Sequence, residues 1–109
     1  YRSMKRGKFA IEFAPEVIDH LKAIPRQQHG LLRAAIHEQL SFTPLVQTRN
    51  RKPLEPPGIY AAAWELRCGA RNRFRVFYVV DELAGRVEVL AIGIKVGSRL
   101  IIGEEEFGT

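Results

Sequence analysis

Residues 64–80, WELRCGARNRFRVFYVV, concentrate the side chains that are best suited to chemistry. The segment contains a single carboxylate, Glu65, and four arginines: Arg67, Arg71, Arg73 and Arg75. A planar guanidinium can bind two phosphate oxygens at once, which makes arginine well suited to gripping phosphate. The segment therefore predicts an anion-binding surface with one acidic group beside it.

The expected hairpin pairs Glu65 with Arg75 and Arg67 with Arg73 across two strands. Like charges that face each other repel, so this pairing does not serve the stability of a sheet. A bound phosphate would explain it, and Phe77 continues the same face with a ring on which a base can stack. The alternative is a solvated arginine face on which Arg75 is simply neutralised by Glu65.

Two further segments bring charged side chains to the same sheet. Residues 43–58 hold four of the six prolines and predict an irregular loop before the central strands. This loop carries Glu55 and a basic cluster, and the turn after the last long strand carries two more cations. The candidate residues for binding RNA or phosphate are Arg67, Arg73, Arg71, Arg49, Arg51, Lys52, Arg99 and Phe77.

Metal and nucleotide chemistry find little support in the sequence. The three histidines form no cluster with metal-ligand spacing, and we expect His20, His29 and His37 to lie on polar helix faces. The segment IHEQLSF begins like the zinc motif H-E-x-x-H, but Ser41 takes the place of the second histidine. No glycine-rich phosphate loop is present. The only cysteine, Cys68, is expected in a turn with no histidine near it in sequence, which disfavours a nucleophilic role.

The periodicity of the apolar residues predicts the elements that position these groups. Alternation indicates a strand at 8–14, and helical spacing indicates one helix that begins at Pro15 and ends before Pro25, and a second from about Arg26 to Phe42. Three strands joined by hairpins follow, at 60–67, 73–80 and 86–95, and then a short apolar segment at 100–102 and an acidic tail. We expect a two-layer α+β fold, β-α-α-β-β-β, with a helical hairpin packed on one face of an antiparallel-rich sheet.

Length and composition fit one soluble domain over residues 1–109, with residues 1–3 before Met4 set aside as a possible expression remnant. No apolar run is long enough to span a membrane, and no signal peptide is evident. A single cysteine agrees with a reducing, cytoplasmic setting. The net charge of +5 and the pI near 9.8 favour an anionic partner, either nucleic acid or an acidic protein segment, over a merely soluble basic surface.

The chain resembles the RelE/ParE superfamily of small bacterial toxins over residues 9–107. The resemblance rests on the order of elements and on three segments: NRFRVFYVVD (72–81), VEVLAIGIKVGSR (87–99) and RKPLEPP (51–57). It implies a microbial-ribonuclease-like fold and the toxin of a type II toxin–antitoxin system, a class linked to plasmid stabilisation. It also implies a cognate antitoxin that covers the basic face, operator DNA contacted only through that antitoxin, and no cofactor.

The resemblance carries over to four residues. Arg75 matches the family arginine that contacts the scissile phosphate, and Arg67 could support it from the central strand. Lys95 falls near the basic residue that leaves the last strand. Glu55 matches a glutamate that serves as a base in one branch of the family. Glu65 joins them as a candidate because it lies beside the arginines, so the candidate catalytic residues are Arg75, Glu65, Glu55 and Lys95.

The RelE branch implies ribosome-dependent cleavage of mRNA, inhibiting translation. The RNA 2′-hydroxyl would attack the adjacent phosphate without a metal, with Arg75 stabilising the phosphoryl charge, Glu65 or Glu55 as base and Lys95 as acid. The sequence departs from this branch at Ala63 and Glu65, where basic residues are common, and at Phe107, which can donate no proton. Two alternatives follow: a DNA gyrase poison of the ParE type, or a non-catalytic antitoxin-binding module.

Overall fold

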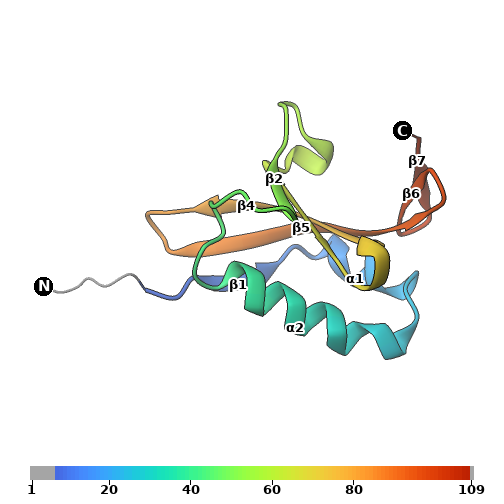
Figure 1. Cartoon of the computed structure of the whole chain (residues 1–109), viewed down its shortest axis with the longest axis horizontal. Helices are drawn as coiled ribbons and strands as arrows, with labels where there is room; N and C mark the ends of the chain where they lie inside the picture. Colours follow the sequence, from blue (N-terminus) through green and yellow to red (C-terminus); the bar gives the residue numbers. More distant parts are fainter. Residues whose placement is uncertain (1–6, 109) are drawn as a thin grey trace, which may run out of the picture.

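The computed structural model describes residues 7–108 as one seven-stranded sheet with two helices on one face. Figure 1 shows both helices on the same side of the sheet, while the loop after β2 rises on the other side. The expected remnant at residues 1–3 lies outside the described residues. In chain order the elements are β1 (Ala10–Phe13), α1 (Glu16–Lys22), η1 (Arg26–Gln28), α2 (His29–Leu40), β2 (Arg51–Pro53), η2 (Ile59–Ala61), β3 (Trp64–Cys68), η3 (Ala70–Asn72), β4 (Phe74–Asp81), β5 (Arg86–Val96), β6 (Arg99–Ile102) and β7 (Glu105–Phe107).

The sheet has the order β2-β3-β4-β5-β6-β7, with antiparallel pairing throughout this path. Strand β1 runs parallel to β5 and pairs with its first residues, from Arg86 to Val89, whereas β6 pairs with the end of β5, from Ile94 to Val96. The expected two-layer α+β fold is confirmed. Two short strands, β2 and β7, occupy segments for which the sequence predicted only a loop and a tail.

The main core lies between the helices and the sheet. Helix α1 contributes Val17, α2 contributes Leu32, Ile36 and Leu40 at helical spacing, and the sheet contributes the apolar residues of β3, β4 and β5 that face them. Ile18, an apolar residue next to Val17 in α1, is 65% exposed. Helix α2 is shorter than expected, because residues 26–28 form a separate 3-10 turn before it.

Two of the three histidines form hydrogen bonds with the backbone of neighbouring segments instead of lying exposed on polar helix faces. His20 is buried in α1, and its Nδ1 accepts a hydrogen bond of 3.3 Å from the backbone N–H of Ile92. Ile92 lies on the edge of β5 between the residues paired with β1 and β6. His29 Nε2 lies 2.9 Å from the carbonyl oxygens of Leu21 and Ile24 at the end of α1. The expected polar surface position holds for His37 alone.

A second, smaller core lies on the face of the sheet away from the helices. Its buried members come from β4, β5, β6 and the segment before β3: Ala62, Phe77, Ala91 and Ile102. Strand β5 is therefore covered on both faces, as its nearly continuous apolar run predicted. Phe77 is only 3% exposed, so the expectation of an open ring for base stacking is wrong. The ring packs beneath the C-terminal hairpin because apolar side chains of β6 and β7 cover it.

The register of the central hairpin differs from the expected one by two residues. Arg67 lies opposite Arg75, and Glu65 lies opposite Phe77. The turn closes over residues 69–73 rather than 68–72, because Cys68 continues β3 and the chain reverses only at Gly69, whose φ is +83°. A shift of two residues keeps each side chain on its predicted face, so the arginines remain on the side away from the helices.

Candidate functional site

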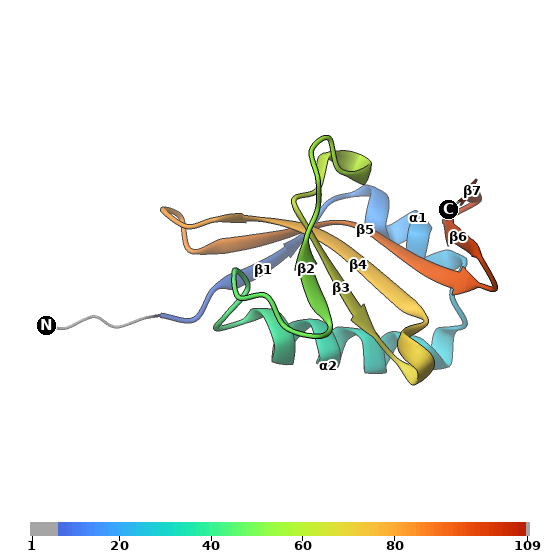
Figure 2. The ribbon, with the colours of Figure 1, turned by 45° about the horizontal axis from the view of Figure 1, so that its top comes forward.

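A hollow of about 410 Å³, with several charged side chains in its lining, lies on the sheet face away from the helices. Figure 2 shows β2, β3, β4 and β5 side by side, the strands that supply most of its charged side chains. The loop after β2 and the start of β6 provide apolar walls that no local sequence pattern predicts. The hollow is lined by Lys52, Leu54, Glu55, Pro57, Gly58, Ile59, Glu65, Arg67, Arg75, Phe77, Lys95 and Leu100.

Glu65 is the centre of the charge arrangement in this hollow. Its Oε2 lies 3.2 Å from Nη1 of Arg75 and 3.9 Å from Nε of Arg67. Its Oε1 lies 3.7 Å from Nζ of Lys52. The Glu65 side chain is only 8% exposed, so these ion pairs are less screened by solvent than surface pairs. Three cations from β2, β3 and β4 thus share one carboxylate.

Arg75 is held more firmly than the other cations. Besides its bond to Glu65, its Nε donates a hydrogen bond of 3.1 Å to the backbone carbonyl of Asn72. Its side chain is 15% exposed, compared with 37% for Arg67 and 51% for Lys52. A guanidinium fixed at two atoms loses little further freedom when it binds an anion, which favours a positioned charge over a mobile one.

Strand β5 has a glycine opposite this arginine. Gly93 lies opposite Arg75, and a Cβ at Gly93 would come within 2.8 Å of Cγ1 of Ile102 and 3.0 Å of the Ile101 carbonyl oxygen. The glycine therefore lets β6 fold closely over the sheet at this point. Lys95 follows two residues later on the same face, and its backbone N–H donates to the Arg73 carbonyl at 2.7 Å.

Lys95 and Glu55 also line the hollow. Among residues 7–108, neither side chain forms an ion pair, and Glu55 is exposed. The six ionisable side chains that line the hollow are four cations and two carboxylates, which leaves two positive charges in excess. The arrangement can bind a phosphate group, with Glu55 and Lys95 available as proton acceptor and donor.

Arg51 does not belong to this hollow, and the expectation that it binds phosphate is wrong. The side chain is buried at 6% exposure on the helix side of the sheet. Its Nη1 donates hydrogen bonds to the carbonyl oxygens of Gln39 and Thr43, the former at 2.9 Å. Arg51 therefore ties β2 to the end of α2, and it faces this way because it pairs with Leu66, a core residue.

Four other candidate cations lie outside the hollow. Arg49 and Arg71 are exposed in turns, and Arg73 places its guanidinium 5.4 Å from the centre of the Phe74 ring. Arg99 forms an ion pair of 3.4 Å with Glu106. The structure thus brings Arg75, Arg67, Lys52, Lys95 and both glutamates together but separates the remaining arginines from them.

Other chemistries receive no support from the described residues. Cys68 is the last residue of β3, so the expectation that it lies in a turn is wrong. Its burial raises the pKa of the thiol to about 11, which disfavours the reactive thiolate near neutral pH. Within residues 7–108, no three side chains among His, Cys, Asp and Glu gather as a metal site. Over the same residues, no helix has the length and apolar character needed to cross a membrane.

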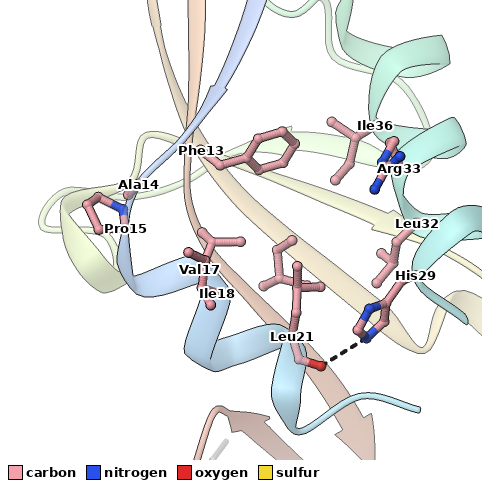
Figure 3. Close-up of a pocket in the computed structure, with 11 residues that line it drawn as sticks. Phe13, Ala14, Pro15, Val17, Ile18, Leu21, His29, Leu32, Arg33 and Ile36 are labelled. Carbon is pink, nitrogen blue, oxygen red and sulfur yellow. Dashed lines mark hydrogen bonds between the residues drawn. The ribbon is translucent and has the colours of Figure 1, made fainter. Parts of the chain in front are cut away.

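A second hollow, apolar and about 300 Å³ in volume, separates the two helices. Figure 3 shows Phe13 pointing from the end of β1 toward Ile36 and Arg33 of α2. Phe13 is 43% exposed, and Ile18 of α1 lines the same groove. His29 and Arg33 add polar groups on the α2 side. Phe13 and Ile18 thus leave apolar surface exposed together at this groove rather than scattered singly over the molecule.

Comparison with known proteins identifies the fold. No protein-family model matches the chain, and no curated protein matches it. Among solved structures, a chain in the toxin–antitoxin complex RelBE2 from Mycobacterium tuberculosis superposes with a TM-score of 0.68 at 21% sequence identity. The match covers 87% of this chain and 100% of the other. The chain has a RelE-type fold. The fold implied by the sequence resemblance is therefore confirmed.

Proposed function

We propose that this chain is the toxin of a type II toxin–antitoxin system, and that it inhibits translation by ribosome-dependent cleavage of mRNA. The observation that carries the proposal is the hollow in which Arg75, Arg67, Lys52 and Lys95 converge beside Glu55. The proposal is also supported by the fold, which this chain shares with a chain of a toxin–antitoxin complex.

In the proposed reaction the RNA supplies its own nucleophile. Glu55, which has no ion-pair partner among residues 7–108, takes the proton from the 2′-hydroxyl. The attack forms a bond from the 2′-oxygen to phosphorus, and the bond to the 5′-oxygen breaks to leave a 2′,3′-cyclic phosphate. Arg75 and Arg67 stabilise the charge that develops on the phosphoryl oxygens. Lys95 protonates the departing 5′-oxygen.

The proposed partner is an antitoxin that binds the groove between α1 and α2. A short amphipathic helix would place apolar side chains against Phe13 and Ile18 and a carboxylate beside Arg33. The solved complex supports such a partner because it pairs a chain of this fold with an antitoxin.

The deciding experiment is induction of the wild-type chain and of Arg75→Ala in bacteria without an antitoxin. We expect the wild type to stop growth and to cut mRNA in a translating extract. We expect the variant to lose cleavage by about a hundredfold or more, because a positioned charge at the phosphate is removed. Arg26→Ala, an exposed arginine of η1, is the matched control and keeps wild-type toxicity.

Three other results of this experiment would point away from a ribonuclease that works through Arg75. A folded Arg75→Ala protein that remains fully toxic would overturn the assignment of the hollow. Intact mRNA together with blocked supercoiling would instead identify a gyrase poison, which needs only a binding surface. Harmless expression of the wild type would identify a module that serves only to hold its antitoxin.

A further inference from the structure

The Glu65 carboxylate occupies the position at which the three innermost cations of the hollow meet. Its two oxygens contact Arg75, Arg67 and Lys52 at 3.2, 3.9 and 3.7 Å. A carboxylate presents oxygen acceptors to a guanidinium much as a phosphate does. The carboxylate is held in place by the sheet, because Glu65 is the second residue of β3 and its side chain is only 8% exposed.

Charge counting shows what this carboxylate does to an incoming anion. Without Glu65, the innermost cluster would present three positive charges, whereas with it the cluster presents two. Arg75 also loses donors to the protein, since its Nε is bonded to the Asn72 carbonyl and its Nη1 to Glu65. An anion that approaches the cluster must therefore compete with Glu65 for the same guanidinium groups and is repelled by it.

We infer that Glu65 is an internal counter-anion that weakens phosphate binding in this hollow and so sets the affinity of the chain for RNA. This inference rests on the proposed function, because it concerns the same hollow. It gives Glu65 a role opposite to that of a general base, since loss of the carboxylate tightens binding.

The arrangement has a consequence for selectivity. A hollow whose cations are already partly neutralised holds an isolated phosphate weakly, so stable binding requires additional contacts along an RNA strand. Exposed cations outside the hollow, such as Arg71 and Arg73 in the adjacent turn, are placed to supply them. Glu65 therefore favours a polynucleotide over inorganic phosphate.

The test compares Glu65→Gln with the wild type by fluorescence anisotropy on a labelled 12-nucleotide single-stranded 2′-O-methyl RNA, which lacks the nucleophile and cannot be cut. Glutamine keeps the shape of the side chain and an oxygen that accepts from Arg75. We expect binding about five- to tenfold tighter at low salt. We also expect the salt dependence to steepen by about 0.7 in log K per log salt, as for one more effective phosphate contact. Unfolding followed by circular dichroism confirms that both proteins are folded.

Glu88→Gln is the matched control. It removes the same charge from an exposed position on β5 outside the hollow, and we expect its affinity to stay within about twofold of the wild type. Equal or weaker binding by Glu65→Gln would overturn the inference, as would an equal gain in Glu88→Gln. Absence of RNA binding in all three proteins would overturn it as well.

The outcomes separate this inference from the proposed function. Tighter binding by Glu65→Gln with no mRNA cleavage by the wild type supports the counter-anion and rejects the ribonuclease. Cleavage by the wild type that is lost in Glu65→Gln, without tighter binding, supports the ribonuclease and makes Glu65 a base or a positioning residue instead.

Discussion

Arg67 and Arg75 lie directly opposite each other on β3 and β4, and both approach the same oxygen of Glu65, at 3.9 and 3.2 Å. Two facing arginines would repel each other across a sheet. The carboxylate two residues before Arg67, on the same face of β3, offsets this repulsion. A basic surface of this kind can therefore be built into the middle of a sheet without unfolding it.

Arg51 is expected to contribute to stability rather than to RNA binding. Arg51→Ala removes the donors that serve the carbonyl oxygens of Gln39 and Thr43, and it leaves a gap between β2 and α2. We expect a loss of about 2–4 kcal/mol in the free energy of unfolding. Urea denaturation measures this loss. Arg49→Ala, at an exposed turn position nearby, should change stability by less than about 0.5 kcal/mol. A similar effect of both substitutions would contradict the structural role.

His20 makes stability depend on pH. Burial lowers the pKa of His20 below its usual value of 6.5, although the nearby Glu16, Asp19 and Glu105 oppose this shift. The unfolded chain therefore takes up a proton more readily than the folded one, and protonation of Nδ1 also breaks its bond with Ile92. The His20 contribution is complete above pH 6.5 and is lost as the pH falls toward the lowered pKa.

The measurement for His20 is urea unfolding of the wild type and of His20→Asn at pH 7.5 and pH 5.5. We expect the wild type to lose more stability than the variant on acidification, because asparagine does not titrate. Parallel losses in the two proteins would show that other groups carry the pH dependence.

Cys68 is expected to react slowly with thiol reagents. Because burial raises its pKa to about 11, roughly one thiol in a thousand is ionised at pH 8. Modification by iodoacetamide should therefore be slow in the folded protein and fast in urea, where the thiol is exposed. Mass spectrometry follows the reaction. Rapid modification of the folded protein would contradict the position of Cys68 in the core.

Gly93 is expected to be required for the closure of the C-terminal hairpin. A Cβ at this position would meet Ile102 at 2.8 Å and the backbone of Ile101 at 3.0 Å, so β6 would have to move away from β5. We expect Gly93→Ala to destabilise the fold by about 1–3 kcal/mol, measured by thermal unfolding. The matched control is Gly30→Ala in α2, where nothing lies within 4 Å of the new Cβ, and alanine should stabilise the helix.

Local patterns in the sequence predicted much of the framework. The spacing of Leu32, Ile36 and Leu40 indicated the buried face of α2, and the alternation in β3 and β4 placed Arg67 and Arg75 on the side away from the helices. These features follow from periods of 3.6 and 2 residues, which each segment carries by itself. The predicted faces are correct although the predicted pairing of β3 with β4 is wrong by two residues, because a shift of two residues leaves every side chain on its own face of the sheet.

Long-range packing decided what those patterns could not. The charged side chains near Arg51 in sequence gave no sign that this arginine turns toward the helices, since its direction depends on pairing with Leu66 in a strand 15 residues away. Phe77 alternates like an exposed residue, yet the C-terminal hairpin covers it.

The sequence by itself determined the α+β order of elements and the face that carries the arginines, because short-range periodicity encodes both. Only the tertiary structure decided which cations meet at Glu65 and which residues β6 and β7 bury. Those choices depend on strand register and on contacts between segments far apart in the chain, for which a local pattern holds no information.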